Sequence, residues 1–217
     1  MEQPVIVNNC ESKKELMHDD ALMVKISISY PQFECKNKKP LSSINRHYKK
    51  IANSCLRYAK RDLLPTAVTA YNFSKENGFP FSPNEMAIGY KITLNNGKFL
   101  SLYHDHYLFT GGAHGNTTRC GDTWCVSDEF PLTLKHFFIG TKKYKRLLID
   151  NAKHIATLQI ADGTHTYFEN YPALIAKYFN PRSFFLTASG IVTFYGQYEI
   201  APYVEGIPEF LYKCGLT

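Results

Sequence analysis

The chain has 217 residues, of which 44% are hydrophobic and 14% aromatic, and it carries a formal net charge of +6. This composition excludes a disordered chain and is typical of a packed globular protein. The modest positive charge gives only a weak preference for anionic partners, and no apolar run approaches the roughly 20 residues of a membrane span.

The N-terminal 20 residues are polar, and we expect residues 1–20 to form a poorly ordered segment. This segment has no basic stretch followed by an apolar one, so no secretory signal is predicted and a cytoplasmic location is expected. A cell-surface location is the alternative, if an upstream segment carries an anchor. The six cysteines are scattered, and a chain of this length does not need disulfides, so we expect reduced thiols.

The first elements in chain order are a strand and a long helix. Alternating apolar and polar residues predict a strand from Ala21 to Glu34. A helix is expected over residues 42–64, because Ile44, Tyr48, Ile51 and Cys55 recur at helical spacing. Pro65 should end or kink this helix, and a second helical stretch is expected as far as Gly78.

Further strands and helices follow. A hairpin is predicted over residues 86–109, with its turn at Asn95-Asn96-Gly97, and a strand from Asn116 to Val126. Helices are expected over 142–161 and 172–179, and short strands over 184–186 and 191–195. The pattern has no βαβ rhythm and predicts an α+β fold, with a mixed or antiparallel sheet built from hairpins and packed against two main helices.

The domain organisation expected from this pattern is a single packed unit with two subdomains. The N-terminal subdomain, residues 21–110, holds the first strand, the long helix and the hairpin. The C-terminal subdomain covers residues 111–217. No internal repeat separates them.

Histidines and cysteines around residue 110 raise the possibility of a metal site. His104 and His106 share one face of a strand, and His114 follows them. Cys120 and Cys125 are five residues apart, whereas zinc-binding cysteines come as a pair two to four residues apart in a turn. We therefore expect no metal and no other cofactor, and keep His104, His106 and His114 as the alternative metal set.

Catalytic motifs are not recognisable in the chain. It has no G-x-S-x-G nucleophile turn, no paired carboxylates suited to glycoside hydrolysis, and no glycine pattern that binds phosphate. The sequence therefore favours a non-enzymatic protein. An uncharacterised hydrolase or metal-dependent enzyme, using the histidines around 104–114, is the alternative.

One face of the long helix is basic. No acidic residue occurs from Leu41 to Arg61, and six basic side chains fall within roughly 120° of one another on a helical wheel. Such a face could attract a nucleic acid or another anionic polymer, and this is a further alternative function. An ordinary solvated surface is the favoured interpretation. The side chains concerned are those of Arg46, Lys49, Lys50, Arg57, Lys60 and Arg61.

Glycines crowd around one histidine in the sequence TGGAHGNT at 110–117. Gly111, Gly112 and Gly115 permit positive φ and close backbone approach, which is typical of a bulged or crossing connection between strands. His114 would then hydrogen-bond a backbone group as a structural pin.

Four motifs together resemble a known family. TGGAHGNT at 110–117, PLTLKHFF at 131–138, YEIAPYVEGIPEF at 198–210 and YPQFE at 30–34 are similar to the signature of a bacterial domain of unknown biochemical function. This domain occurs in the extracellular part of RsiV-type anti-sigma factors and in the non-catalytic N-terminal region of PdaC-type peptidoglycan deacetylases. The resemblance implies an α+β fold and no catalytic activity of the domain itself. In the anti-sigma members the domain binds lysozyme.

This resemblance implies a recognition module whose ligand is a protein such as lysozyme or a cell-wall-related molecule. Trp124, the single tryptophan, is either a contact residue or a core ring. Gly111, Gly112, Gly115, Gly206 and Pro208 are expected to support the fold. The candidate binding residues are His114, Trp124, Tyr198, Glu199, Pro202 and Tyr203.

Overall fold

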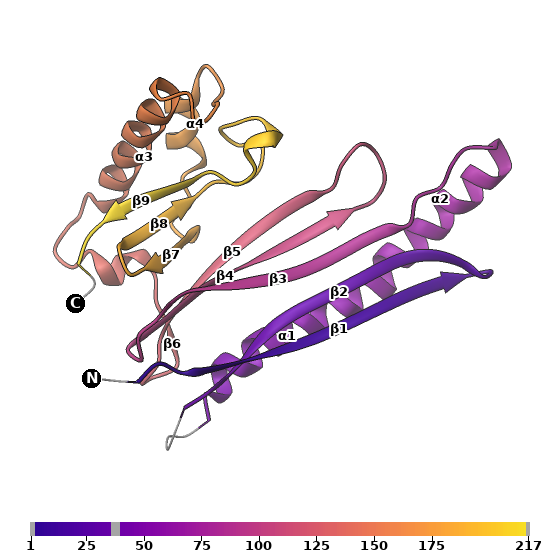
Figure 1. Ribbon diagram of the computed structural model, residues 1–217, viewed down its shortest axis with the longest axis horizontal. Helices are drawn as coiled ribbons and strands as arrows, with labels where there is room; N and C mark the ends of the chain where they lie inside the picture. The colour runs from indigo at the N-terminus through magenta and orange to yellow at the C-terminus, as the bar shows by residue number, and fades with distance from the viewer. Residues whose placement is uncertain (1–2, 36–39, 216–217) are drawn as a thin grey trace. The chain divides into compact units, whose positions relative to one another are not determined.

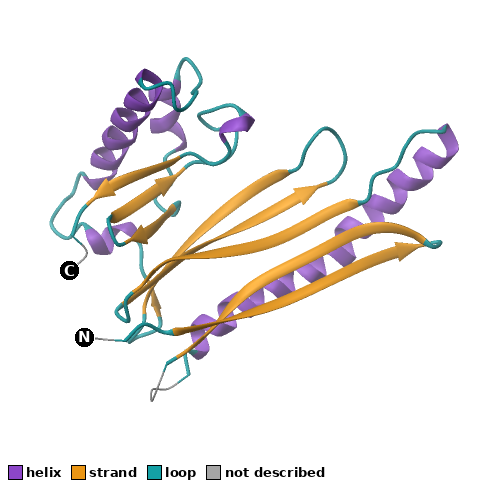
Figure 2. Cartoon of the chain, in the orientation of Figure 1, coloured by secondary structure: helices purple, strands orange, loops and turns teal. Residues whose placement is uncertain are grey.

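The computed structural model describes residues 3–35 and 40–215 and confirms the α+β class (Figures 1 and 2). Within these described residues, nine strands form a six-stranded sheet in the order β1-β2-β3-β4-β5-β6 and a three-stranded sheet in the order β7-β8-β9, where the sequence had suggested one sheet. The strands are β1 (Ile6–His18), β2 (Ala21–Glu34), β3 (Asn84–Asn95), β4 (Phe99–Phe109), β5 (Asn116–Cys125), β6 (Phe130–Pro131), β7 (Phe184–Thr187), β8 (Gly190–Phe194) and β9 (Glu209–Lys213).

The helices follow the predicted pattern closely. None of those in the described residues combines the length and the apolar character that crossing a membrane requires. The helices are α1 (Ser42–Tyr58), the π-helical η1 (Ala59–Leu63), α2 (Leu64–Asn77), the 3-10 turn η2 (Leu134–Phe137), α3 (Tyr144–Ala161), α4 (Tyr171–Tyr178) and the 3-10 turn η3 (Tyr203–Glu205).

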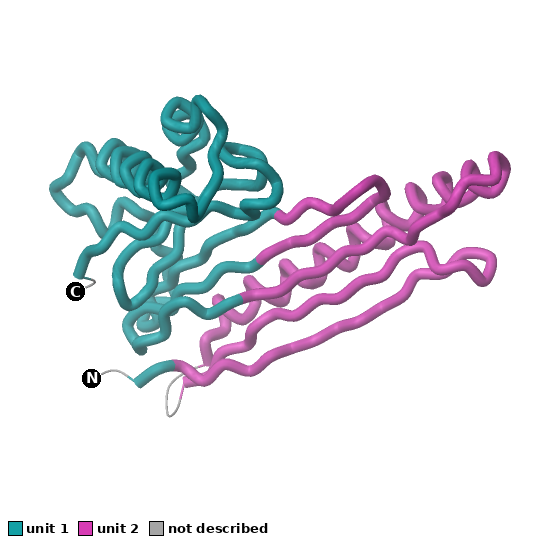
Figure 3. Tube along the Cα trace, turned by 45° about the horizontal axis from the view of Figure 1, so that its top comes forward, with its two compact units in different colours: residues 1–4, 91–104, 118–217 teal, residues 5–90, 105–117 magenta. Residues whose placement is uncertain are grey.

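The chain forms two compact units, coloured separately in Figure 3. The N-terminal unit holds residues 5–90 and 105–117, and the C-terminal unit holds residues 1–4, 91–104 and 118–217. Strands β3, β4 and β5 contribute residues to both units. The division therefore differs from the expected one, in which a single point near residue 110 separates two subdomains.

The N-terminal segment is a correction to the sequence analysis, which expected residues 1–20 to be poorly ordered. Residues Ile6–His18 form β1, which pairs antiparallel with β2 from end to end. Asp19 and Asp20 join the two strands with φ of 46° and 60°, as a tight two-residue hairpin turn requires. β1 is an edge strand whose lysines, glutamates and asparagines leave little alternation of apolar and polar residues, so the pattern hides it.

The long helix connects β2 to β3, which pair in parallel. The sequence analysis found no βαβ unit, but this connection is one. Its buried side chains form a core against β2 and β3, and α1 lies along one face of β1 and β2 in Figure 1. Asn45 at the start of α1 ties the helix to β2, since its side chain accepts the Phe33 N–H at 2.7 Å and donates to the Phe33 carbonyl at 2.9 Å.

Pro65 interrupts the hydrogen bonding of this helix without ending it. Proline has no N–H to donate, and its ring crowds the carbonyl one turn earlier. The helix accommodates this with the π-helical turn η1 immediately before α2. It ends where predicted, at Gly78, whose φ of 70° makes it a left-handed C-cap.

In the C-terminal unit, α3 and α4 pack with the three-stranded sheet around a core that includes Ala152, Ile175, Tyr195 and Phe210. Gly121 of β5 lies so close to β7 that a Cβ there would be 2.0 Å from the Phe184 carbonyl oxygen. Three contacts of the buried Ser101 hydroxyl reinforce this crossing. Ser101 Oγ accepts the Leu186 N–H at 2.8 Å, lies 2.8 Å from Thr123 Oγ1 and donates to the Asp122 carbonyl at 3.2 Å.

Candidate functional site

The C-terminal motif forms a loop over residues 196–208, here called the motif loop, between β8 and β9. Its first turn is closed by Glu199, whose carboxylate accepts the Gly196 N–H at 2.7 Å. A Cβ at Gly196 would lie 3.2 Å from that carboxylate, so glycine gives the side chain room to fold back. Tyr198, inside this turn, has a φ of 63°, which is unusual for a residue with a side chain.

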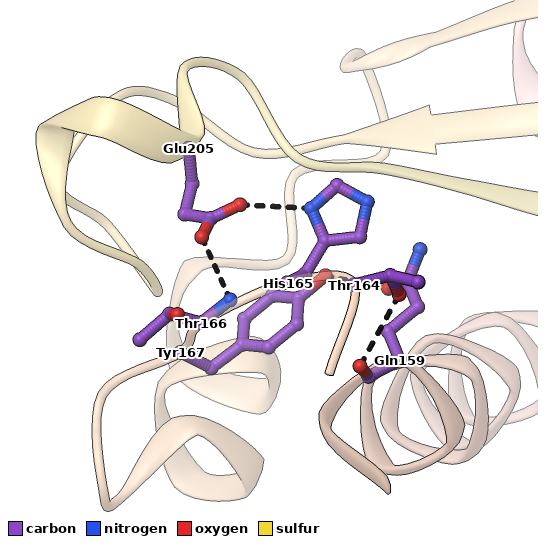
Figure 4. A network of polar contacts seen from close by, with 6 residues as sticks. All are labelled: Gln159, Thr164, His165, Thr166, Tyr167 and Glu205. Carbon is purple, nitrogen blue, oxygen red and sulfur yellow. Dashed lines mark hydrogen bonds and ion pairs between the residues drawn. The ribbon is translucent and has the colours of Figure 1, made fainter. Parts of the chain in front are cut away.

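The second half of the motif loop is held by Glu205, as Figure 4 shows. Its carboxylate lies 2.8 Å from His165 Nδ1 and accepts the Thr166 N–H at 2.7 Å. The hydrogen bond with His165 is the main reason that the pKa of Glu205 is lowered from its ordinary value, and partial burial opposes this effect. The η3 turn is thereby fastened to the segment that follows α3.

Two tyrosines beside this network also lose access to solvent. Tyr167 donates to Gln159 Oε1 at 2.7 Å, and burial together with the negative charge of Glu205 raises its pKa to about 12. Tyr195, at the start of the motif loop, is 2% exposed and donates to the Ile175 carbonyl. Burial, followed by the charge of Glu199, raises the pKa of Tyr195 above its ordinary value. Both phenol groups therefore stay neutral and act as hydrogen-bond donors next to the motif loop.

What the motif loop exposes is apolar and aromatic. Tyr198 is 52% exposed and Val204 is 86% exposed. The half-buried Tyr203 lies beside Tyr198, with ring centroids 5.5 Å apart and ring planes tilted by 31°. These three side chains are called the motif-loop surface below. The sequence analysis did not select Val204, because an apolar valine within the motif is expected to pack in the core.

The remaining candidate residues of this motif shape the loop or are buried. Pro202 precedes η3 as its N-cap residue, and Gly206 ends the turn with a φ of 65°. Pro208 is buried, and its carbonyl accepts the Tyr195 N–H at 3.0 Å. Trp124, on β5, is 6% exposed and lies in the core, so its ring does not reach the surface.

The glycine-rich stretch is an exposed turn after β4. Gly111 and Gly112 have φ of 101° and 89°, and a Cβ on either would meet no atom within 4 Å. Gly115 differs, since a Cβ there would lie 2.4 Å from the ring of Tyr107. His114 Nδ1 is 3.2 Å from the Gly115 carbonyl oxygen, which is a local backbone contact. These glycines are thus used for backbone conformation and for packing of one ring.

The other two candidate histidines lie on β4. His104 is buried, with Nε2 3.3 Å from Asp122 Oδ2. His106 is half-buried, and its Nδ1 is 3.9 Å from Cys55 Sγ of α1. Burial raises the pKa of the Cys55 thiol. No disulfide joins any of the six cysteines, all of which lie in the described residues.

The basic face of the long helix is exposed along its whole length. Each of its six basic side chains is solvent-accessible. Two of them make local contacts, Arg57 donating to Ser54 Oγ at 2.8 Å and Arg61 to Asp62 Oδ2 at 3.0 Å. Both contacts are local to the long helix.

Two stretches of the chain are similar to known protein families. Residues 17–117 match a family model described as deacetylase PdaC, and residues 137–211 match one described as a protein of unknown function, DUF3298. The chain is thus similar to the PdaC family over its first half and to the DUF3298 family over most of its second half. This confirms the resemblance that the sequence motifs indicated. Between them the two matches include the glycine-rich turn and the motif loop.

Solved structures show the same fold over nearly the whole chain. A DUF3298 family member from Bacteroides fragilis superposes with a TM-score of 0.73 at 15% identity, covering 98% of this chain and 92% of that one. A DUF3298 family protein from Pseudomonas aeruginosa gives a TM-score of 0.64 at 18% identity, with the same coverage. A comparison with curated proteins gives no match. At these identities the likeness establishes the fold alone.

Proposed function

We propose that this PdaC/DUF3298-type chain is a non-enzymatic recognition module that binds a protein ligand, with lysozyme as the first candidate, through the motif-loop surface. The observation that carries the proposal is the exposure of Tyr198 and Val204 on a loop that Glu199 bonds to itself and Glu205 bonds to the segment after α3. Aromatic side chains of this kind supply large contact area at low entropic cost.

The rigidity of the motif loop supports this role. Glu199 closes one turn and Glu205 binds the η3 turn to His165, while Pro202 restricts the backbone between Tyr198 and Tyr203. A loop ordered before binding loses less conformational entropy when a partner docks. Lysozyme is chosen because the sequence motifs resemble a domain that binds it in RsiV-type anti-sigma factors.

Titration calorimetry with lysozyme tests the proposal. We expect binding by the wild-type chain and a loss of about 2 kcal/mol or more in Tyr203→Ala or Tyr198→Ala, the range of hot-spot residues. Val204→Ser should weaken binding by a smaller amount. The binding heat should persist in variants that alter exposed apolar residues elsewhere.

Ile139→Ser is the matched control for Val204→Ser. Ile139 is 90% exposed in the same compact unit, but it follows η2 and lies outside the motif loop. Equal weakening in both variants would contradict a specific role of the motif loop. Absence of binding by the wild-type chain would remove lysozyme as the ligand.

A further inference from the structure

The N-terminal unit contains a hollow of about 600 Å³ on the face of the six-stranded sheet opposite α1. Ile26 of β2, Met86 of β3 and Leu108 of β4 all pack in the core that includes residues of α1. Successive side chains of a strand project from opposite faces, so the neighbours of these three residues project into the hollow. Its volume lies in the range of ligand sites, roughly 300–1,000 Å³.

Small side chains form the floor of the hollow, and an aromatic ring forms one wall. Ser27 and Ala87 are direct neighbours on β2 and β3, and both line the hollow. Tyr107 of β4 also lines it, and a Cβ at Gly115 would lie 2.4 Å from the Tyr107 ring. Gly115 belongs to the glycine-rich turn, so this part of the TGGAHGNT motif gives the ring room beside the hollow.

Charged side chains cross the hollow in two rows. The first row holds Glu15, Lys25 and Glu85, which are direct neighbours on β1, β2 and β3. Lys25 Nζ is 3.7 Å from Glu85 Oε1, and Glu15 lies opposite Lys25, so this row has one cation between two carboxylates. The next row holds the exposed Lys13, opposite Ser27. The two rows therefore offer charges of opposite sign to a ligand.

The spacing of the two rows matches that of an extended peptide. The rows are two residues apart on each strand, which corresponds to about 7 Å. Side chains i and i+2 of an extended peptide have the same spacing and face the same way. A peptide in the hollow can thus place a basic side chain at the row with two carboxylates and an acidic side chain at Lys13.

We propose that this hollow binds an extended peptide segment that carries a basic and an acidic side chain two residues apart. Glu15 and Glu85 contact the basic side chain, Lys13 contacts the acidic one, and the Tyr107 ring packs against the peptide. The site is separate from the motif-loop surface, which belongs to the C-terminal unit. Because its charges are exposed to solvent, salt weakens binding.

Nuclear magnetic resonance titration of the full chain tests this proposal. The probe is the pentapeptide Ala-Lys-Ala-Glu-Ala with both termini blocked, and the reference is the blocked peptide Ala-Gln-Ala-Gln-Ala. We expect the probe to shift the backbone amide signals of residues 13–15, 25–27, 85–87 and 107. Shifts of equal size with the reference peptide, or no shifts in these strands, would overturn the proposal.

Substitutions in the hollow and matched controls locate the site. Glu85→Gln and Lys13→Gln should each weaken binding of the probe about two- to fivefold, the range of exposed ion pairs. Ser27→Leu, at an exposed position, should prevent binding because the larger side chain fills the hollow. Lys75→Gln and Glu76→Gln remove exposed charges of α2 in the same unit and should leave binding unchanged. The dispersion of the amide signals checks that each variant folds. Equal weakening in the α2 variants would overturn the assigned site.

Discussion

The glycine-rich turn at 110–115 and the crossing of β5 with β7 use glycine in opposite ways. Gly111 and Gly112 occupy open space and are required only for their positive φ. At Gly121 the backbone has no such conformation, but a Cβ would meet the Phe184 carbonyl oxygen at 2.0 Å. Gly111 and Gly112 thus allow a backbone conformation, whereas Gly121 allows the close approach of two strands.

This difference shows that a cluster of glycines in the sequence is a weak sign that the fold requires glycine there. The cluster at 110–115 attracts attention because several glycines surround one histidine, whereas Gly121 stands alone in a strand pattern. The isolated glycine is nevertheless one whose Cβ would meet backbone, whereas Gly111 and Gly112 of the cluster have open space around them. Four variants, ordered by expected effect, test and extend the comparison.

Gly121→Ala should be the most damaging of these changes. The added methyl group would force β5 away from the Phe184 carbonyl, since backbone cannot swing aside as a side chain can. Overpacking costs about 1–3 kcal/mol and occasionally more, and we expect a clash with backbone to lie at the upper end of this range. Urea unfolding should show this loss in the free energy of unfolding. Stability equal to that of the wild type would mean that β5 and β7 do not approach so closely.

Ser101→Ala should have the next largest effect, at the same crossing. Ser101 is fully buried and its hydroxyl accepts the Leu186 N–H, so the alanine variant leaves that donor without its partner. An unsatisfied buried group costs about 1–3 kcal/mol. The control is Ser189→Ala, an exposed serine in the turn between β7 and β8. Similar urea midpoints for the two variants would contradict the assigned contact.

Glu205→Gln extends the comparison to the motif loop, whose backbone is held by a charged side chain and not by close packing around a glycine. Because the folded pKa of Glu205 is lowered, the folded state binds fewer protons than the unfolded state in the affected window. Its stabilising contribution is present above the ordinary value of 4.5 and is lost as pH falls through the folded pKa.

Thermal unfolding measured from neutral pH to below pH 4 (roughly the ordinary range of a glutamate) checks this effect. The wild type should lose stability below the ordinary glutamate value more steeply than Glu205→Gln. His165→Ala should reduce the slope as well, because His165 is the main cause of the lowered pKa. Parallel pH profiles for all three proteins would show that the carboxylate does not fasten the loop.

Gly112→Ala should have the smallest effect. Its φ of 89° is unfavourable for alanine, but a Cβ meets nothing within 4 Å, so we expect a loss of about 1 kcal/mol. Gly89→Ala is the matched control. Gly89 also lies in open space but has no positive φ, and its substitution should be neutral or slightly stabilising. Equal losses in urea unfolding would mean that backbone conformation is not the cause.

The elements with local signals could be predicted from the sequence. The apolar spacing of Ile44 and Tyr48 identified the long helix, and Gly78 identified its end. The edge strand β1 could not be predicted in this way, because polar residues on both faces remove the alternation that identifies a strand. The alternation of apolar and polar residues arises because one face of a strand is buried, and an exposed edge strand buries little of either face.

The candidate site was only partly predictable for a related reason. The tyrosines of the motif loop were selected from the family motif, but the exposure of Val204 depends on the η3 turn that carries it. The approach of Gly121 to Phe184 and the bond from Glu205 to His165 join residues far apart in the chain. Such contacts depend on the tertiary fold and leave no local signal.

Hydrogen exchange of the backbone amides, with and without lysozyme, tests the central claim most directly. The account predicts slower exchange at residues 196–208 when lysozyme is present, and little change at the exposed glycine-rich turn 110–115. Unchanged exchange across the motif loop, or protection confined to another surface, would contradict the proposal that this loop is the recognition surface.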